Sequence, residues 1–290
     1  MAVHDLVYQL RQGLDRFSPV ERRIADAILA DIPAAAQSGV GELAQRAGVS
    51  VAAVSRFAKA LGCAHVRELR ARLAEAGAVG RRFLDEAQAA PLPVLHAQIA
   101  DDLDAAVRRN LAGLSETVVQ GLAGALAGAR RIHVFGMGGS SAVFGQELQH
   151  RLTRLGLPAA ACSDAVAMRM LAATLQEGDV VLALSVSGRN PELLEAVEIA
   201  GSYGATLAAC TRPGTPLAAR ARWLLPLALE ETDFVFKPSA SRYALLLAID
   251  VLATTVALLD PAGNRERLRR IKLALDGWRG GGDERLPLGD

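Results

Sequence analysis

The spacing of apolar residues changes along the chain, and the change falls near residue 130. In residues 1–75, apolar side chains recur every three or four positions between short turns, which is typical of amphipathic helices. From residue 130 onward, short continuous apolar runs alternate with helical patterns. This alternation predicts a parallel sheet covered by helices on both faces. The expected fold is an all-helical amino-terminal domain followed by a doubly wound, five-stranded parallel α/β domain.

The elements expected in the second domain follow from these runs. Its strands are predicted at 132–135, 159–162, 180–184, 206–210 and 224–227, and its helices at 142–155, 165–175, 191–203, 216–221, 242–259 and 266–275. Residues 95–126 are predicted to be mainly helical, and this segment could connect domains, pack between subunits or begin the second domain. The predicted boundaries are 1–78 for the first domain, 79–93 for a linker, 94–279 for the second domain and 280–290 for a loose tail.

Residues 40–62 predict a helix-turn-helix. Gly48 stands where the first helix should end in a left-handed conformation, and Ser50 can cap the second helix. Two short helices joined in this way are typical of DNA-binding units whose second helix enters the major groove. The residues expected to meet DNA are Ser50, Val51, Ala53, Ser55, Arg56 and Lys59. An ordinary helical hairpin with solvated charges is the alternative interpretation.

Local charge supports the nucleic-acid interpretation better than overall charge does. The formal net charge is only +1, but residues 45–82 carry eight Arg or Lys and two Glu. Within the helix-turn-helix, Arg56 could pair with guanine or phosphate, and Lys59 is expected to contact phosphate. Arg67, Arg70 and Arg72, on a further helix, could also hold the DNA backbone.

Two loops rich in glycine and serine each follow a predicted strand and precede a predicted helix. Such loops can bind anions through backbone N–H groups, hydroxyl groups and the helix dipole. The candidate ligand-binding residues are Gly138, Gly139, Ser140 and Ser141 in the first loop, and Ser185, Ser187, Gly188 and Asn190 in the second. No lysine follows the first loop, which excludes a Walker A loop. Each loop alone could also be a turn without a ligand, whereas two at the strand ends of one parallel sheet favour a phosphorylated ligand.

The segments LAQRAGVSVAAVSRFAKALG, VFGMGGSS, SDAVAMRM, LSVSGRNPELLEA and KPSASR together carry a resemblance. The chain resembles the RpiR family of bacterial transcription regulators, in which a helix-turn-helix precedes a sugar isomerase (SIS) domain that binds phosphosugars. The resemblance covers nearly all of residues 1–275. It implies three partners: operator DNA, a phosphorylated sugar effector, and further copies of the chain in a homodimer or homotetramer.

The resemblance also implies roles for individual residues. Ser140 matches the serine of the family's GxGxS loop, and Ser185 and Ser187 match the SxSG serines that hold the phosphate. Asn190 stands where many members have threonine, so an amide replaces a hydroxyl group there. The residues that match a family segment near the sugar are Ser239, Ser241 and Arg242. Arg189 and Arg242 would add positive charge near the pocket, with surface salt bridging as the alternative.

The leading functional hypothesis is a transcriptional regulator whose operator affinity responds to a phosphorylated sugar or sugar acid. An aldose–ketose isomerase with an accessory helical domain is the first alternative, and a protein-binding scaffold is the second. An isomerase needs a positioned base. The candidates Glu147, His150, Glu230 and Glu231 form no recognisable catalytic arrangement, so no catalytic residue is expected. His133, in the first strand, is expected to be a core or ligand-edge residue.

The remaining composition adds only expectations of absence. Cys63, Cys162 and Cys210 are far apart and predict buried free thiols in a reducing compartment. With five His and no CxxC or HxxxH motif, neither a metal site nor a cofactor is expected. No secretion signal or membrane-spanning apolar run is recognisable, so the cytoplasm is the expected location.

Overall fold

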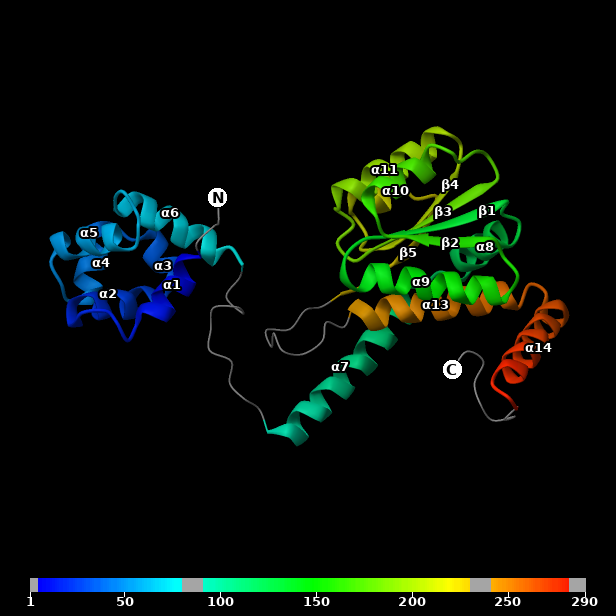
Figure 1. Cartoon of the computed structure of the whole chain (residues 1–290), viewed down its shortest axis with the longest axis horizontal. Helices are drawn as coiled ribbons and strands as arrows, with labels where there is room; N and C mark the ends of the chain where they lie inside the picture. The colour runs from blue at the N-terminus through cyan, green and yellow to red at the C-terminus, as the bar shows by residue number, and fades with distance from the viewer. Residues whose placement is uncertain (1–4, 80–90, 230–240, 282–290) are drawn as a thin grey trace. The chain divides into compact units, whose positions relative to one another are not determined.

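The computed structural model describes residues 5–79, 91–229 and 241–281, which fall into two compact units (Figure 1). The helices of the amino-terminal unit are α1 (Leu6–Gly13), α2 (Pro19–Ala30), α3 (Ile32–Gln37), α4 (Val40–Ala47), α5 (Val51–Ala60) and α6 (Val66–Gly77). Side-chain caps set where several of them start: Asp5, Ser18, Asp31, Ser50 and His65 each accept a backbone hydrogen bond in the first turn. The unit is all-helical, as the apolar spacing predicts.

One hydrophobic core holds these short helices together. Its largest fully buried side chain, Phe57 of α5, meets the ring of Phe17 edge-on, with 5.2 Å between ring centroids. Helices this short are marginal in isolation, so their stability comes from this shared core. Consequently α5 is presented on a fixed scaffold.

The second unit contains a fully parallel five-stranded sheet in the order β2-β1-β3-β4-β5. Its strands are β1 (Arg131–Gly136), β2 (Ala159–Cys162), β3 (Asp179–Ser185), β4 (Thr206–Thr211) and β5 (Trp223–Pro226). Its helices are α7 (Leu92–Gly113), α8 (Glu116–Ala127), α9 (Gly139–Arg154), α10 (Ala165–Ala172), α11 (Pro191–Ser202), α12 (Pro216–Arg220), α13 (Ser241–Ala257) and α14 (Pro261–Trp278). The predicted fold class is confirmed.

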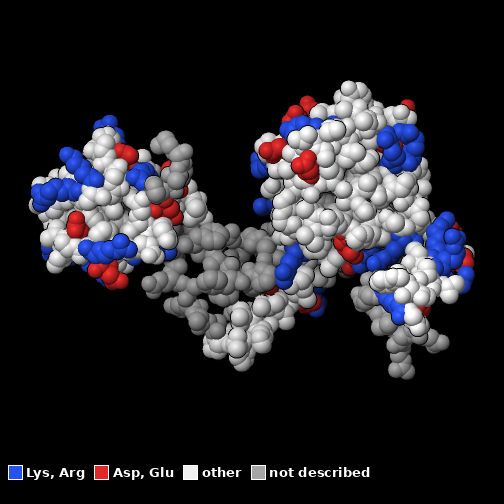
Figure 2. Space-filling model, viewed as in Figure 1, with Lys and Arg blue, Asp and Glu red and all other residues white. Residues whose placement is uncertain are grey.

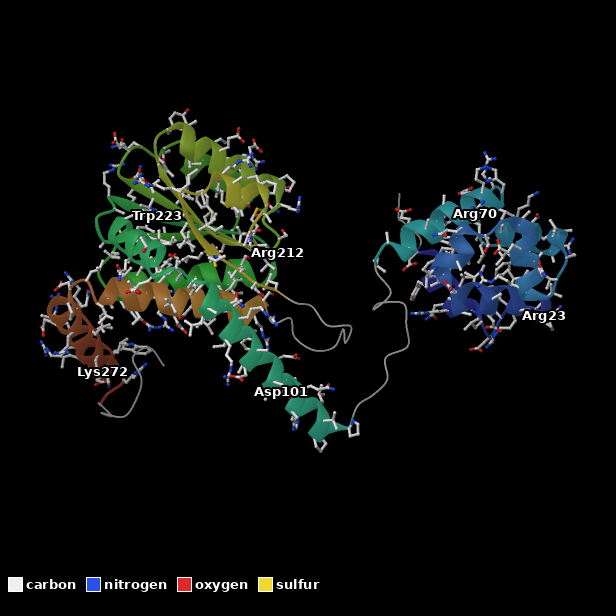
Figure 3. The ribbon with its side chains drawn as sticks, turned by 180° about the vertical axis from the view of Figure 1, so that it is seen from behind. Arg23, Arg70, Asp101, Arg212, Trp223 and Lys272 are labelled. Carbon is white, nitrogen blue, oxygen red and sulfur yellow. The ribbon has the colours of Figure 1, made fainter. Side chains whose placement is uncertain are left out.

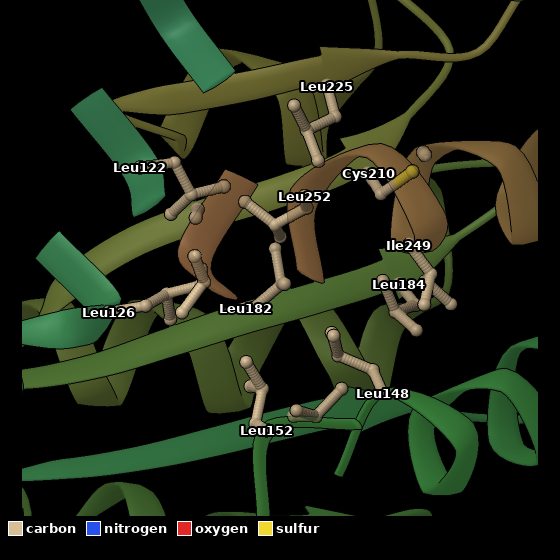
Figure 4. Packing of buried hydrophobic residues seen from close by; sticks show 14 of the residues in the cluster. Leu122, Leu126, Leu148, Leu152, Leu182, Leu184, Cys210, Leu225, Ile249 and Leu252 are labelled. Carbon is tan, nitrogen blue, oxygen red and sulfur yellow. The ribbon is translucent and has the colours of Figure 1, made fainter. Parts of the chain in front are cut away.

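Helices cover both faces of the sheet. On one face, α8, α9 and α13 pack on alternate strand residues such as Leu182 and Leu184 (Figure 4). On the other face, α10, α11 and α12 pack on the intervening residues, among them Val181 and Ala183. Every residue of β3 is buried, as expected for the central strand of a doubly wound sheet.

Some expected boundaries were wrong. The helical pattern of residues 95–126 is broken after Gly113, and two helices, α7 and α8, result. The helix α9 starts at Gly139, not at residue 142, because glycines in unusual conformations turn the chain into it at once. The helix α14 runs from Pro261, beyond the expected 266–275. Residues 80–90 of the predicted linker and 282–290 of the predicted tail lie outside the described residues, and α7 already includes Leu92.

The amino-terminal edge of the sheet is fixed by one buried carboxylate, Asp179 at the start of β3. Arg130 and Arg131 donate to its oxygens at 3.0 and 2.8 Å, and the N–H of Gln176 also donates at 3.0 Å. Burial alone would raise the pKa of Asp179, but these hydrogen bonds outweigh it and lower the pKa to about 2. The carboxylate therefore stays ionised and joins the starts of β1 and β3.

The three cysteines are free thiols, but they are not all buried. Cys63 and Cys210 are buried as predicted, and burial raises the pKa of the Cys210 thiol to about 12. Cys162 is only half-buried, because it ends β2, which is an edge strand of the sheet.

No single helix among the described residues is both long and apolar enough to cross a membrane. The helices α13 and α14 meet that test of length and composition only as a pair, and a bend of 109° separates them.

Candidate functional site

The two predicted anion loops leave the sheet from neighbouring strands. β1 and β3 pair in parallel, with Gly136 opposite Leu184, so their loops start side by side at the carboxyl edge. β1 continues toward β2 on one side and pairs with β3 on the other, which makes this position the topological switch point of the sheet. Ligands of doubly wound folds bind at such a point.

The first loop leaves the start of α9 open. Gly138 and Gly139 have φ values of +69° and +25°, which side chains other than glycine adopt at a cost. Gly138 is the N-cap of α9 and, being glycine, offers no side-chain acceptor to the first-turn N–H groups, which also have no intrahelical partners. Ser140 is half-buried, whereas Ser141 is buried. The predicted donors therefore stand at the helix start, but Ser141 is the less accessible serine.

The second loop is more occupied by its own contacts. Ser185 is buried, and its Oγ accepts a hydrogen bond from the N–H of Gly188 at 3.1 Å. Ser187 is exposed, and its Oγ accepts from the N–H of Arg189 at 3.4 Å. Asn190 is the N-cap of α11, where its Oδ1 accepts from the N–H of Leu193 at 2.8 Å. Both hydroxyl groups keep their hydrogen for donation to a ligand.

A third loop, after β4, joins this edge and was missed from the sequence. Thr211 pairs with Ser185 across the strands and is fully buried. A Cβ atom built on Gly188 would lie 2.6 Å from Oγ1 of Thr211 and 2.3 Å from Oγ1 of Thr215. The N–H of Leu217 also donates to the carbonyl oxygen of Gly188 at 3.2 Å. Thr215 before Pro216 is a helix-start signal that could have drawn attention to this loop.

The two arginines expected near the pocket, Arg189 and Arg242, fall in different places, and Arg212 adds a charge that was not predicted. Arg189 lies exposed in the second loop, and Arg212, labelled in Figure 3, lies exposed directly after β4. Arg242 does not join them in the described contacts: its guanidinium donates to the hydroxyl of Tyr243 at 2.8 Å and stacks on that ring. Ser241 is buried at the start of α13, and Ser239 lies outside the described residues.

The candidate bases that the structure describes, Glu147 and His150, both lie on α9 beyond its first turn. Glu147 of α9 accepts a hydrogen bond from Nε of Arg151 at 2.6 Å, one turn further along the same helix. Burial, followed by the charge of Arg131, lowers the pKa of His133, which is a buried core residue of β1. Glu230 and Glu231 lie outside the described residues. Within the described ranges, no group of three or more His, Cys, Asp or Glu could hold a metal ion.

The helix-turn-helix forms as predicted from α4, a tight turn and α5. Gly48 ends α4 with φ +62°, and Ser50 caps α5 by accepting from the N–H of Ala53 at 3.2 Å. Ala53, one of the expected DNA contacts, is buried against the core, because it lies one turn before the buried Phe57 on the same face of α5, whereas Ala52 is exposed. Of the others, Val51, Arg56 and Lys59 are exposed and Ser55 is half-buried.

An open hollow of about 440 Å³ lies beside the start of α5. It is lined by the helix-turn-helix residues Ala44, Gln45, Gly48, Val49, Ser50, Ala53 and Arg56, together with Val20 and Arg23 of α2. Arg23, labelled in Figure 3, is exposed and shares this hollow with Arg56. Sequence reasoning missed Arg23 because it lies 33 residues before Arg56 and outside the motif.

Not every arginine near the motif is available to DNA. Arg70 donates to the carbonyl oxygens of Ala36 and Gln37 at 3.0 and 2.9 Å and thus ties α6 to the end of α3. Arg72 donates to Sγ of Cys63 at 3.4 Å. These two arginines stabilise the fold, which corrects their expected backbone-holding role. The remaining cations are part of the blue surface of this unit in Figure 2.

Comparison with known proteins agrees with both halves of this description. Residues 4–79 match the helix-turn-helix domain of the rpiR family, and residues 125–255 match the SIS domain. The chain is 32% identical to the HTH-type transcriptional regulator HexR of Pseudomonas aeruginosa over 277 residues, which cover 93% of this chain and 95% of that protein. It is 34% identical to the bifunctional protein glk of Burkholderia orbicola over 89% of this chain but 40% of that protein.

Solved structures show the same fold. The Vibrio vulnificus NanR protein complexed with ManNAc-6P aligns over 93% of this chain and 98% of its own, with a TM-score of 0.59 and 22% identity. The sugar isomerase domain of an RpiR transcription factor from Sphaerobacter thermophilus aligns over 61% and 97%, with a TM-score of 0.56 and 22% identity. From its helix-turn-helix, its SIS domain and its full-length relatives, the chain belongs to the RpiR family of helix-turn-helix transcriptional regulators.

Proposed function

We propose that this regulator binds a phosphorylated sugar or sugar acid at the carboxyl edge of its sheet, and that the ligand changes its affinity for operator DNA. The observation that supports this most strongly is the adjacency of two loops at the switch point, each leading into a helix N-terminus. The supporting charge comes from Arg189 and Arg212 at the same edge.

The chemistry of the edge suits a phosphoryl group. A phosphate offers several acceptor oxygens and about two negative charges, so it needs several donors that converge in a small space. The open N–H groups at Gly139 and Ser140, with the hydroxyl hydrogens of Ser185 and Ser187, supply such donors. The helix dipoles of α9 and α11 add to the attraction.

The nature of the sugar is proposed from a relative. The NanR structure was solved with ManNAc-6P bound. That ligand fits the class expected here, a phosphorylated sugar, without selecting one member of the class for this chain. Catalysis is not part of the proposal, because Glu147 is paired with Arg151 and the full-length relatives are named as transcriptional regulators.

For DNA, the proposal places α5 in the major groove. Val51, Ala52 and Arg56 would meet base edges, and Lys59 and Arg23 would contact phosphate. Two copies would present two such helices to half-sites about one helical turn, or 34 Å, apart. An effector that binds better to one arrangement of the two copies would shift the equilibrium toward it.

The effector half is tested by calorimetry with hexose, amino-sugar and ketodeoxy-acid phosphates. One class should bind, and Ser187→Ala should weaken binding by about tenfold, the cost of one charge-assisted hydrogen bond. This variant is preferable to Ser185→Ala, because Ser185 also holds the N–H of Gly188. No heat with any phosphate would contradict the effector role, and rapid aldose–ketose interconversion would favour the isomerase.

The DNA half is tested by gel shift with the chain's own upstream DNA. Arg56→Ala should weaken specific binding by about tenfold or more. Arg265→Ala, which removes an exposed cation from α14 in the other unit, is the matched control and should leave binding unchanged. Equal effects of the two variants would contradict a base-reading role for α5.

A further inference from the structure

The helix α7 extends beyond the helices that it packs against. Near its carboxyl end, Ala106 and Asn110 are buried, and Asn110 exchanges hydrogen bonds of 3.0 and 2.9 Å with the backbone of Ala228. These contacts and its packing on α13 fix the direction of α7 within the second unit. Its earlier part runs outward from this unit, and Asp101 marks that part in Figure 3.

An apolar strip on α7 is left uncovered. Leu103, Val107 and Leu111 follow one another at four-residue spacing on one side of the helix. Leu103 and Leu111 are 37% and 53% exposed, and Val107 is half-buried. Neighbouring turns of a helix stack these side chains into a continuous surface, which is costly to leave in water.

The strip runs into a groove of about 540 Å³ at the carboxyl end of α7. Mainly apolar residues of α7, α8 and α13, with the turns that follow α7 and α13, line it: Leu111, Leu114, Val119, Val251, Leu258 and Leu259. Leu258 and Leu259 are 66% and 50% exposed. Leu111 belongs to both features, so strip and groove form one surface.

The charged residues beside the strip are complementary to those of a second α7 helix that runs antiparallel to the first. Asp104 and Arg108 lie one turn apart on the same flank, with 2.8 Å between their charged groups, and their side chains are 61% and 78% exposed. If a second α7 lies antiparallel with its centre near Ala106, Asp104 of each copy meets Arg108 of the other. In the same register Leu103 of one copy meets Val107 and Leu111 of the other. A foreign partner would require no such self-complementarity.

We propose that two copies of this chain associate through an antiparallel pair of α7 helices, the outer part of each lying in the groove of the other. The proposal deepens the proposed function, since it names the surface that pairs the two DNA-binding units. The contact is isologous, so each favourable interaction occurs twice. At 1.5 Å per residue, the two Leu92 positions stand about 40 Å apart, close to the pitch of one DNA turn.

The test is the association constant of the full chain, measured by sedimentation over a range of concentrations. Leu103→Glu with Leu111→Glu should weaken association at least 100-fold. Val94→Glu is the matched control: Val94 is 47% exposed on the opposite side of the same helix, so its substitution should change association less than threefold. Circular dichroism verifies that all variants are folded. A monomeric wild-type chain, or equal effects of the two substitutions, overturns the proposal.

Charge reversal and cross-linking test the register independently. Arg108→Glu should weaken association about tenfold, and adding Asp104→Arg should restore it, because the reversed pair is again complementary. Val107→Cys, near the twofold axis, should form disulfide-linked dimers under mild oxidation, whereas Val94→Cys should not. Failure of both the rescue and the cross-link overturns the antiparallel register.

The result is separable from the proposed effector function. The monomeric variant should still bind the sugar phosphate by calorimetry and a single operator half-site by gel shift, while losing affinity for paired half-sites. If no sugar phosphate binds any variant, the effector function fails but the helix pair stands. If the phosphate binds while the leucine variants remain dimeric, the pairing fails alone.

Discussion

The loops after β1 and β3 have the same local order: a buried strand, a turn of glycine and serine, and a helix. They differ in how their polar groups are occupied. At α9 the cap is Gly138, two glycines have positive φ, and the first turn holds no acidic residue. At α11 the cap is Asn190, and Glu192 lies in the first turn. In the first loop the N–H groups at the helix start have no side-chain acceptor, whereas in the second loop Ser185, Ser187 and Asn190 already accept from backbone N–H groups and only their remaining hydrogens can be donated.

The largest expected effect is a loss of stability when the packing of the second loop, around Gly188, is disturbed. Gly188→Ala would force its Cβ against Thr211 and Thr215 at a positive φ of 62°, and should lower the free energy of unfolding by about 3 kcal/mol. Gly138→Ala has no atom within 4 Å of the added Cβ, so its cost is the backbone strain at φ 69° and ψ 157°, about 2 kcal/mol. Urea unfolding compares the two, and equal costs would contradict the difference in packing.

The next effect concerns the anion. Ser140→Asp places a negative charge in the first turn of α9, where it should stabilise the free protein by about 0.5 kcal/mol through the helix dipole. The same charge should repel a phosphorylated ligand and weaken its binding by about 30-fold, or roughly 2 kcal/mol. Ser140→Asn is the neutral control. Thermal unfolding measures the expected gain in stability, and calorimetry measures the expected loss of ligand affinity. Unchanged ligand affinity would mean that the phosphate binds elsewhere.

A smaller effect is expected at the cap of α11. Asn190→Ala removes the acceptor of the N–H of Leu193 and should cost about 1 kcal/mol of stability. Asn190→Asp keeps the acceptor and is the control, with stability near that of the wild type. If only the aspartate variant loses stability, the amide nitrogen of Asn190, and not its capping oxygen, contributes to the free energy of unfolding.

The smallest effect on stability is expected for Thr211, the buried residue next to Gly188. Thr211 is fully buried, and its hydroxyl has no hydrogen-bond partner among the described residues. Thr211→Val replaces this hydroxyl with a methyl group of similar size and should change stability by less than about 0.5 kcal/mol. If urea unfolding of the free protein changes little while ligand binding weakens tenfold or more, the hydroxyl belongs to the ligand site.

Much of this comparison could be predicted from the sequence, because apolar runs, glycines and helix caps are local signals. The five strands, the order of the two loops and the cap at Ser50 are of this kind. The occupancy of the loops could not be predicted, because it depends on contacts such as that of Gly188 with Thr211 and Thr215, more than 20 residues away. A glycine- and serine-rich loop therefore indicates where an anion site can form, not how open it is.

The same distinction explains the corrections in the amino-terminal unit. Ala52 and Ala53 are chemically identical, so only their positions around the axis of α5 decide which one is exposed. Arg70 looks like a DNA-binding arginine in a basic segment, but carbonyl oxygens 33 and 34 residues earlier occupy it. The contacts of Arg70 leave no mark in the local pattern of the sequence, whereas the burial of Ala53 follows from its four-residue spacing to Phe57.

The carboxylate of Asp179 lies at the opposite edge of the sheet from the two anion loops, yet it influences how those loops are spaced. It fixes the starts of β1 and β3, and six residues of β1, about 20 Å of strand, separate it from the loops. Any relative slippage of those two strands would alter the spacing between the openings of α9 and α11. Substitutions at Arg131 or Asp179 would thus change the geometry of the proposed effector site without altering any residue placed in it.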